Sequence, residues 1–324
     1  MNYTFEGQFA ERIYKFVEQK NAVGYPYVES SRILRDFDKF CTDMFPAEAS
    51  LTKEIFLSWA VKKDTEGNNT LRNRLMPVRE FARYLNRCGE DAYVLPPNFV
   101  KKGARHIPHI YSEKEIRAVW KVVDEIKPKK NYPIRHIVIP TFMRLLYCCG
   151  LRPCEARKIR VADVDLKKGR IDISESKGFK SRIVMMSDDV SQMCRDYNEQ
   201  AENLMPGREL FFPNSDGKLY TKKWIEKTFS IVRKKAGLVK AGEHPPRLYD
   251  FRHTFATHRL YQWMNEGKDL TAMLPYLSAY MGHVQLSDTY YYIHLVPGIF
   301  EKMAGVDYSS LENLMPEVEV DNDE

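Results

Sequence analysis

A basic segment near residue 100 is the feature that most limits how this chain of 324 residues folds. Its residues that interrupt regular structure are Pro96, Pro97, Gly103 and Pro108. Its bases are Lys101, Lys102 and Arg105. Such a composition is typical of an extended linker rather than of a helix or a strand. We therefore predict an N-terminal domain over residues 1–105, which ends in this linker, and a second domain over residues 106–306.

The residues before the linker show only the periodicity of helices. Four helices are predicted there, and the fourth begins near Thr70, a residue type that caps helices well. Pro77 is expected to kink this helix or divide it. Its apolar residues recur at the spacing of one helix face. Four arginines lie off that face: Arg72, Arg79, Arg83 and Arg87. Such charges usually form a solvated surface, and the alternative is a helix that lies along a nucleic-acid backbone.

The residues beyond the linker predict helices and one small sheet. Ser112 and Glu115 form a capping box that opens a helix. Residues 170–174 and 182–186 alternate between apolar and polar side chains, as strands of a hairpin do. The predicted fold class is mainly α with a small antiparallel β-sheet (α+β).

Charge is unevenly distributed along the chain. The chain has 50 basic and 44 acidic residues, a net charge of +6, and five of the acids stand in the last ten residues. A body this basic favours a polyanionic partner, although many soluble proteins have a similar charge. We predict that residues 307–324 form a C-terminal segment with an acidic, disordered end.

Several classes of protein are not expected. The sequence has no apolar run long enough to span a membrane and no signal-peptide pattern, so we predict a cytoplasmic protein with no membrane partner. The six cysteines lack the spacing of a metal site, and we predict reduced thiols, no metal and no cofactor.

Two segments of the second domain carry groups suited to phosphate chemistry. Arg152 stands in a turn between helices with Glu155 three residues later. A positioned guanidinium can bind two phosphate oxygens, and the alternative is a structural ion pair. Lys177 lies at the predicted hairpin turn, where it can protonate a leaving alkoxide or simply keep the turn soluble.

Three later segments add further candidates. Tyr249 and Arg252 are three residues apart and share a helix face if the helix starts at Asp250 or just before it. His283 follows Gly282, a pair that suggests an exposed imidazole at a helix end. Tyr290, Tyr291 and Tyr292 point three ways on a helix, so at most two can face one site. Each segment alone also has an ordinary structural interpretation as a cap or a packing residue.

Together, and in this order, the segments resemble the tyrosine recombinase (phage integrase) family over roughly residues 107 to 300. The resemblance implies that the catalytic residues are Arg152, Lys177, Arg252, His283 and Tyr292, with Glu155 in support. Thr289-x-x-Tyr292-x-His294 matches the family's nucleophile signature, and Tyr292 falls nine residues after His283. This spacing selects Tyr292 over the two preceding tyrosines. The helical N-terminal domain is similar to the family's core-binding domain, a DNA-binding module, which implies DNA contacts from its arginines and from the linker bases.

One position departs from the family pattern. Tyr249 stands where the family usually has the histidine of His-x-x-Arg. A tyrosine can donate a hydrogen bond to a phosphate oxygen, but its ordinary pKa of about 10 prevents it from acting as an imidazole does. We assign Tyr249 a secondary role.

The resemblance implies a site-specific recombinase or integrase that cleaves double-stranded DNA through a 3′-phosphotyrosyl intermediate. It also implies a homotetramer in synapsis and, as the source, a transposon or other mobile element. The residues after Tyr292 are expected to dock on a neighbouring protomer or on their own domain. The alternatives are a catalytically degenerate accessory or architectural DNA-binding protein, a type IB-like topoisomerase, and an RNA-binding protein, although no RNA motif is found.

Overall fold

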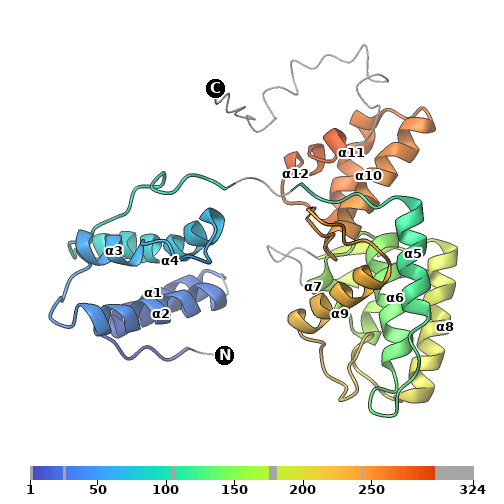
Figure 1. Cartoon of the computed structure of the whole chain (residues 1–324), viewed down its shortest axis with the longest axis horizontal. Helices are drawn as coiled ribbons and strands as arrows, with labels where there is room; N and C mark the ends of the chain where they lie inside the picture. The colour runs from blue at the N-terminus through green and yellow to red at the C-terminus, as the bar shows by residue number, and fades with distance from the viewer. Residues whose placement is uncertain (1–2, 25–26, 104–106, 175–180, 243, 296–324) are drawn as a thin grey trace. The chain divides into compact units, whose positions relative to one another are not determined.

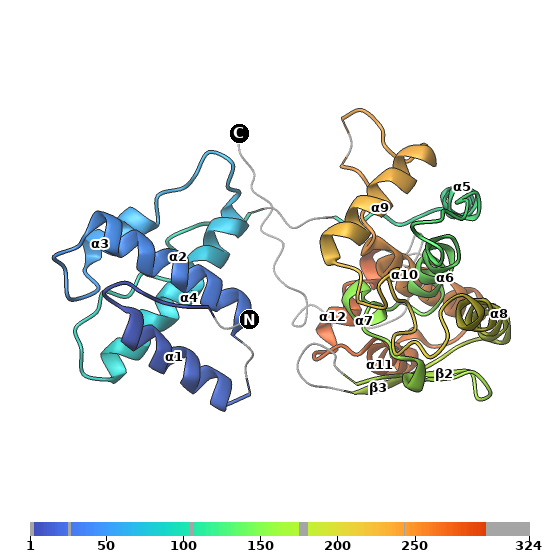
Figure 2. The ribbon, with the colours of Figure 1, turned by 90° about the horizontal axis from the view of Figure 1, so that it is seen from below.

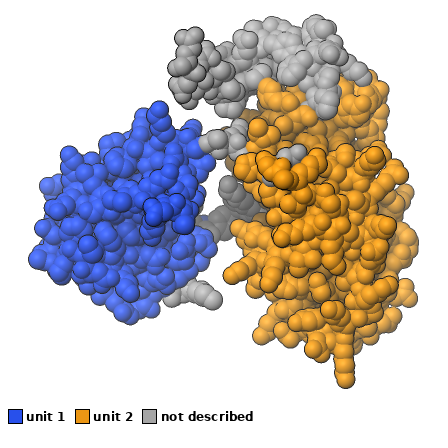
Figure 3. Space-filling view, in the orientation of Figure 1, with its two compact units in different colours: residues 1–106 blue, residues 107–324 orange. Residues whose placement is uncertain are grey.

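The structure is a computed structural model that describes residues 3–24, 27–103, 107–174, 181–242 and 244–295. The chain divides into two compact units, residues 1–106 and residues 107–324 (Figure 3). Among the described residues, no helix is long and apolar enough to cross a membrane.

The regular elements of unit 1, among its described residues, are all helices. Its helices are α1 (Ala10–Ala22), α2 (Val28–Met44), α3 (Lys53–Trp59) and α4 (Asn68–Arg87). Helices α1 and α2 pack against α4 (Figure 1). Phenylalanine rings fill the space between them, and Phe16, Phe37 and Phe81 are buried. The apolar face of each helix therefore closes one core, which explains the helical periodicity of the sequence.

Helix α4 differs from its prediction at its N-terminus, and it is not divided at Pro77. It begins at Asn68 with Gly67 as its N-cap residue, so Thr70 lies inside the helix and the predicted cap is wrong. Helix α4 also continues through Pro77 without dividing, and the proline ring is buried. Burial of that ring in the core compensates for the backbone hydrogen bond that a proline cannot make.

Unit 2 is built around one apolar helix. Its longer helices are α5 (Glu113–Asp124), α6 (Arg135–Cys148), α8 (Asp188–Leu204), α9 (Lys222–Lys235), α10 (Asp250–Asn265) and α11 (Leu270–Met281). Its short helices are α7 (Pro153–Ala156), η1 (Val161–Asp163), α12 (Ser287–Tyr290) and η2 (Ile293–Leu295). Helix α6 packs against α5, α8 and α10 (Figures 1 and 2). This burial on several sides explains why α6 is apolar nearly all round.

A small antiparallel sheet lies beside these helices. Its strands, in the order β1-β2-β3, are β1 (Val164–Asp165), β2 (Arg170–Ile173) and β3 (Arg182–Met185). Strands β2 and β3 confirm the predicted hairpin, and β1 is an additional short strand. Ile171 pairs with Val184, and both face the core. The prediction of a mainly α fold with a small antiparallel sheet is confirmed.

Candidate active site

The side chain of Arg252 is the most deeply buried cation of the site. It extends from the first turn of α10 and is 1% exposed. Its Nη1 donates to the carbonyl oxygen of Gly150 at 2.7 Å, and its Nη2 donates to that of Met281 at 2.6 Å. Burial, followed by the nearby charge of Arg152, lowers the pKa of this guanidinium. Arg252 thus joins the end of α6 to the end of α11.

Arg152 lies in the turn between α6 and α7 and faces the same region. Its Nη1 donates to Oε1 of Glu155 at 2.6 Å, and its Nη2 donates to the carbonyl oxygen of Gly282 at 2.9 Å. The turn depends on Gly150, which has a positive φ of 59°. A Cβ at this glycine would lie 2.4 Å from the ring of Phe255, so a larger residue does not fit.

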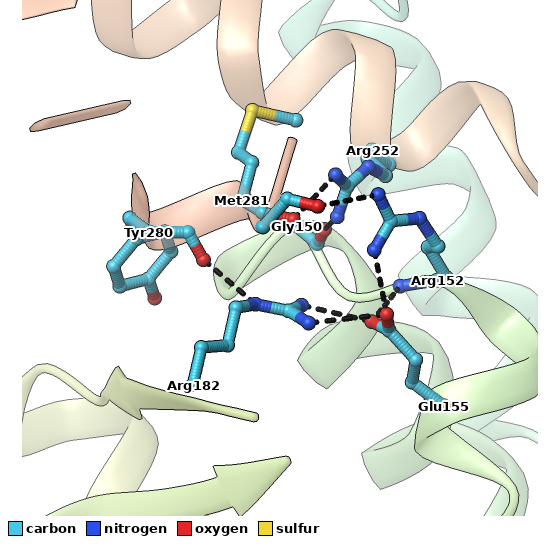
Figure 4. A network of polar contacts seen from close by, with 8 residues as sticks. Gly150, Arg152, Glu155, Arg182, Arg252, Tyr280 and Met281 are labelled. Carbon is cyan, nitrogen blue, oxygen red and sulfur yellow. Dashed lines mark hydrogen bonds and ion pairs between the residues drawn. The ribbon is translucent and has the colours of Figure 1, made fainter. Parts of the chain in front are cut away.

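Glu155 also binds a third arginine, which the sequence analysis did not single out. Arg182, the first residue of β3, contacts both carboxylate oxygens of Glu155 at 3.0 and 2.8 Å. Its Nε donates to the carbonyl oxygen of Tyr280 at 2.9 Å. Figure 4 shows the carboxylate between the guanidinium groups of Arg152 and Arg182. The sequence feature that could have indicated Arg182 is its position as a basic residue at the start of the second strand of the predicted hairpin.

The charge on Glu155 follows from these contacts. Burial by itself would raise the pKa of this carboxyl group, but the ion pairs with Arg182 and Arg152 outweigh burial and lower the pKa to about 2. Glu155 is therefore ionised at neutral pH and partly offsets the positive charge of the arginines.

His283 follows Gly282, the C-cap residue of α11, which has a positive φ of 66°. The Nδ1 atom of His283 lies 2.7 Å from Oγ1 of Thr289. Burial, and then the positive charges of Arg252 and Arg152, lower the pKa of His283 to about 3. The imidazole is therefore neutral at pH 7.

Tyr292 is the buried member of the three consecutive tyrosines. It is 3% exposed, whereas Tyr290 and Tyr291 are half-buried. Its ring stacks on that of His283 with centroids 5.9 Å apart and planes 15° apart. Burial raises the pKa of Tyr292 to about 12, although Arg252 acts in the opposite direction. The phenol is thus protonated at neutral pH and lies beside both an imidazole and a guanidinium.

Tyr249 lies at the edge of this group of side chains. It is the N-cap residue of α10, which begins at Asp250, and it is 37% exposed. Its ring centroid lies 5.2 Å from that of His253, whose ring lies 5.6 Å from that of Tyr292. The sequence analysis did not assign a role to His253, which the fold places between the two tyrosines.

The remaining predicted residues are Lys177, the linker bases and the arginines of α4. Lys177 and Arg105 lie outside the described residues. On α4, Arg72 donates to the carbonyl oxygen of Val100 at 2.6 Å, and Arg83 binds Glu80 at 2.7 Å. Exposed bases of unit 1 include Arg83, Arg87, Lys101 and Lys102, while Arg72 and Arg79 are half-buried.

The sequence and fold were compared with those of known proteins. A model of the phage integrase family matches residues 112–297, more than half of the chain. The chain belongs to this family. A putative integrase/recombinase of Sinorhizobium fredii, y4rB, is 30% identical over 307 residues, which cover 91% of this chain and 95% of that protein. The tyrosine recombinase XerC of Lactobacillus leichmannii is 28% identical, with 70% of this chain and 72% of that protein covered.

Solved structures show the same fold at lower sequence identity. The XerH site-specific recombinase bound to a palindromic difH substrate has a TM-score of 0.63 and 17% identity, covering 89% of this chain and 81% of that one. The Tn1549 transposon integrase in complex with transposon right end DNA has a TM-score of 0.63 and 15% identity, covering 94% and 96%. The family membership makes this chain a tyrosine-type site-specific recombinase, an enzyme that cleaves and rejoins DNA.

Proposed function

We propose that Tyr292 is the nucleophile of this recombinase and that Arg152, Arg252 and His283 bind the scissile phosphate. The observation that carries the proposal is the meeting of these residues, which come from three separate segments, around one buried tyrosine. Charged and nucleophilic groups are costly to bury, so their convergence indicates a functional site rather than packing.

The proposed reaction exchanges one phosphate ester for another. Oη of Tyr292 attacks the phosphorus, the bond from phosphorus to the 5′ oxygen breaks, and a 3′-phosphotyrosyl link remains. The phenol releases its proton to water, and the departing 5′ oxygen gains one from Lys177, the role that the resemblance assigns to that lysine. Attack by a 5′-hydroxyl of a second strand reverses these steps and rejoins the DNA. No metal or nucleotide takes part in this scheme.

In this scheme the two arginines would stabilise the transition state electrostatically. Arg152 and Arg252 would neutralise the charge that builds on the phosphoryl oxygens during attack. Tyr249 would add a neutral donor where the family usually has an imidazole.

Double-stranded DNA is the proposed partner, and a tetramer on DNA is the proposed active assembly. The net charge of +6 favours a polyanion. The similar Tn1549 transposon integrase was solved in complex with transposon right end DNA, and the similar XerH recombinase bound to a palindromic difH substrate. We propose that the arginines of α4 and the linker bases contact the DNA backbone, and that the chain acts in the cytoplasm of a bacterium on a mobile element. The residues after 295, proposed to aid assembly, lie outside the described residues.

Trapping of the covalent intermediate tests the proposed nucleophile. The protein is incubated with nicked suicide substrates made from the ends of its own element, and the mixture is resolved under denaturing conditions. Wild type, Tyr290→Phe and Tyr291→Phe are expected to give a covalent protein–DNA band, and Tyr292→Phe none. A band with Tyr292→Phe would show that the nucleophile is another residue.

The same assay separates the alternatives. Specific binding without any covalent band in the wild type would favour an accessory DNA-binding protein. Relaxation of a supercoiled plasmid that carries no recombination site would favour a type IB-like topoisomerase.

A further inference from the structure

Thr289 is a buried residue that the proposed chemistry has not used. It lies in α12 and is 0% exposed. The backbone N–H of Tyr292 donates to the carbonyl oxygen of Thr289 at 3.0 Å, so the two residues share one turn of chain. The same threonine contacts His283 through its side chain. One short segment therefore holds both the proposed nucleophile and its stacked imidazole.

The contact between Thr289 and His283 bears on where the imidazole proton resides. Oγ1 of Thr289 lies 2.7 Å from Nδ1 of His283. His283 is half-buried near Arg252, Arg152, Arg182 and His253. The positive charges of the three arginines disfavour a charged ring, and Tyr292 stacks on it. A neutral imidazole carries one proton, so one nitrogen donates a hydrogen bond and the other accepts one. The partner of Nδ1 therefore decides what Nε2 can do.

We infer that Thr289 is a positioning residue whose hydroxyl donates to Nδ1 of His283 and so keeps the ring proton on Nε2. This inference rests on the proposed function, because it gives His283 the donor that a phosphoryl oxygen needs. A neutral donor stabilises the growing negative charge on the phosphate without requiring a buried cation. The spacing Thr-x-x-Tyr then has a physical reason, since it places the hydroxyl at Nδ1 on the edge of the imidazole and stacks the phenol ring on that imidazole.

Two matched substitutions of Thr289 separate the effect of its hydroxyl group from the effect of its side-chain shape. Thr289→Val keeps the branched shape but removes the hydroxyl, so Nδ1 loses its partner and the ring can carry its proton on either nitrogen. Thr289→Ser keeps the hydroxyl. Cleavage of a suicide substrate in a single turnover is expected to slow about tenfold in Thr289→Val and to stay within about twofold of wild type in Thr289→Ser.

A double-mutant cycle shows whether Thr289 acts through His283. The rates of wild type, Thr289→Val, His283→Ala and the double variant are compared. The double variant is expected to cleave as slowly as His283→Ala alone, because Thr289 has no ring left to position. A further slowing of about tenfold in the double variant would mean that Thr289 acts structurally, and it would overturn the inference. Wild-type cleavage by Thr289→Val would overturn it as well.

A spectroscopic measurement keeps the inference distinct from the proposed function. Nitrogen chemical shifts of ¹⁵N-labelled histidines report the tautomer of each ring, and the His283 signals are assigned by their absence in His283→Ala. The Nε2–H tautomer is expected in wild type and Thr289→Ser, with a mixture in Thr289→Val. An Nδ1–H tautomer in wild type would overturn the inference. If the tautomer is as expected but His283→Ala cleaves normally, then it is the proposed role of His283 that fails.

Discussion

Glu155 shows how one side chain sets the charge of the whole site. Its carboxylate, 2% exposed, binds Arg152 and Arg182 and stands near the buried Arg252. Without that negative charge the guanidinium groups would repel one another in a region that water reaches poorly. Glu155 therefore lets several cations gather where a phosphate is proposed to bind, while a net positive charge remains for that phosphate.

Replacement of Glu155 by glutamine is predicted to lower stability in a manner that depends on pH. The pKa of Glu155 is lowered from 4.5 to about 2, so its stabilising effect is present above pH 4.5 and is lost as the pH falls toward 2. At pH 7 the expected loss is about 3 kcal/mol in the free energy of unfolding. Urea unfolding at pH 7 and at about pH 3 measures whether the difference from wild type narrows at the lower pH.

The control for this prediction is Glu209→Gln. The Glu209 side chain is 74% exposed and lies 3.6 Å from Arg160, so its removal should change stability by less than about 1 kcal/mol. Equal losses from both variants at pH 7 would contradict the account of Glu155.

Tyr249, the departure from the family pattern, is predicted to assist without being essential. Tyr249→Phe keeps the ring contact with His253 but removes the hydroxyl donor. Because Tyr249 is 37% exposed, cleavage should slow by less than the ~10²-fold that follows loss of an oxyanion donor. Tyr249→His should give a cleavage rate that rises as the pH falls below about 6.5, because the nearby guanidinium groups lower the pKa of an imidazole from its ordinary value. Single-turnover rates between about pH 5.5 and pH 8 test both variants, and a flat profile for Tyr249→His would contradict the prediction.

At the scale of elements, the site depends on how helices end. Helix α6 ends at the turn containing Gly150, and α11 ends at Gly282, each with a positive φ. Backbone carbonyl oxygens exposed at these ends accept hydrogen bonds from Arg152 and Arg252. Carbonyl groups at a helix C-terminus carry partial negative charge, which suits them to hold arginines. Helix ends therefore anchor the cations that the proposed mechanism needs.

Gly282→Ala is predicted to reduce cleavage, because a Cβ at this position would lie 2.8 Å from Cδ of Arg182. The substitution also costs about 1 kcal/mol for the left-handed backbone. Gly237→Ala provides the matched control, since Gly237 has a φ of 73° and a Cβ there would meet no atom within 4 Å. Both variants should lose similar backbone stability in thermal unfolding, but only Gly282→Ala should slow cleavage. Equal cleavage rates would show that the contact with Arg182 is unimportant.

At the scale of the whole molecule, the chain has two units with separate cores. Among the described residues, the hydrophobic cluster of unit 1 spans Phe5 to Leu95, and the clusters of unit 2 begin at Tyr111. Exposed bases such as Lys101 and Lys102 lie in the segment between these cores. Each unit can therefore fold around its own core. Since the lysines of the segment between the cores are not needed for packing, they can bind a negatively charged partner.

Lys101→Ala/Lys102→Ala is predicted to weaken DNA binding in a manner that depends on salt. Each phosphate contact contributes roughly 0.9 to the slope of log affinity against log salt concentration, so the slope should fall by roughly 2. Lys167→Ala/Lys168→Ala removes two equally exposed charges from the turn between β1 and β2 and serves as the control. Titrations with labelled duplex at several salt concentrations measure both slopes. An unchanged slope in the linker variant would exclude those lysines from the interface.

Much of this organisation was predictable from the sequence. Apolar periodicity predicted the helices and the hairpin, and the capping box of Ser112 and Glu115 is present. The fixed distance between His283 and Tyr292 selected one tyrosine of three, and that tyrosine is the buried one. These features are local, because a helix, a cap or a motif is set by residues a few positions apart. The wrong cap at Thr70 shows the limit of such local prediction. Several neighbouring residues can begin a helix with similar free energy, so the sequence does not define the first residue.

The hydrogen bonds and ion pairs that hold the site together could be found only in the folded structure. Arg252 meets the carbonyl oxygen of Gly150, 102 residues earlier, and Arg182 meets that of Tyr280, 98 residues later. Such partners depend on how α6, β3, α10 and α11 pack, which no local pattern encodes. A buried charge must find its hydrogen bonds wherever the closed fold presents them. Local sequence patterns were therefore enough to predict the candidate reactive residues. Their surroundings and orientation depend on how distant segments pack.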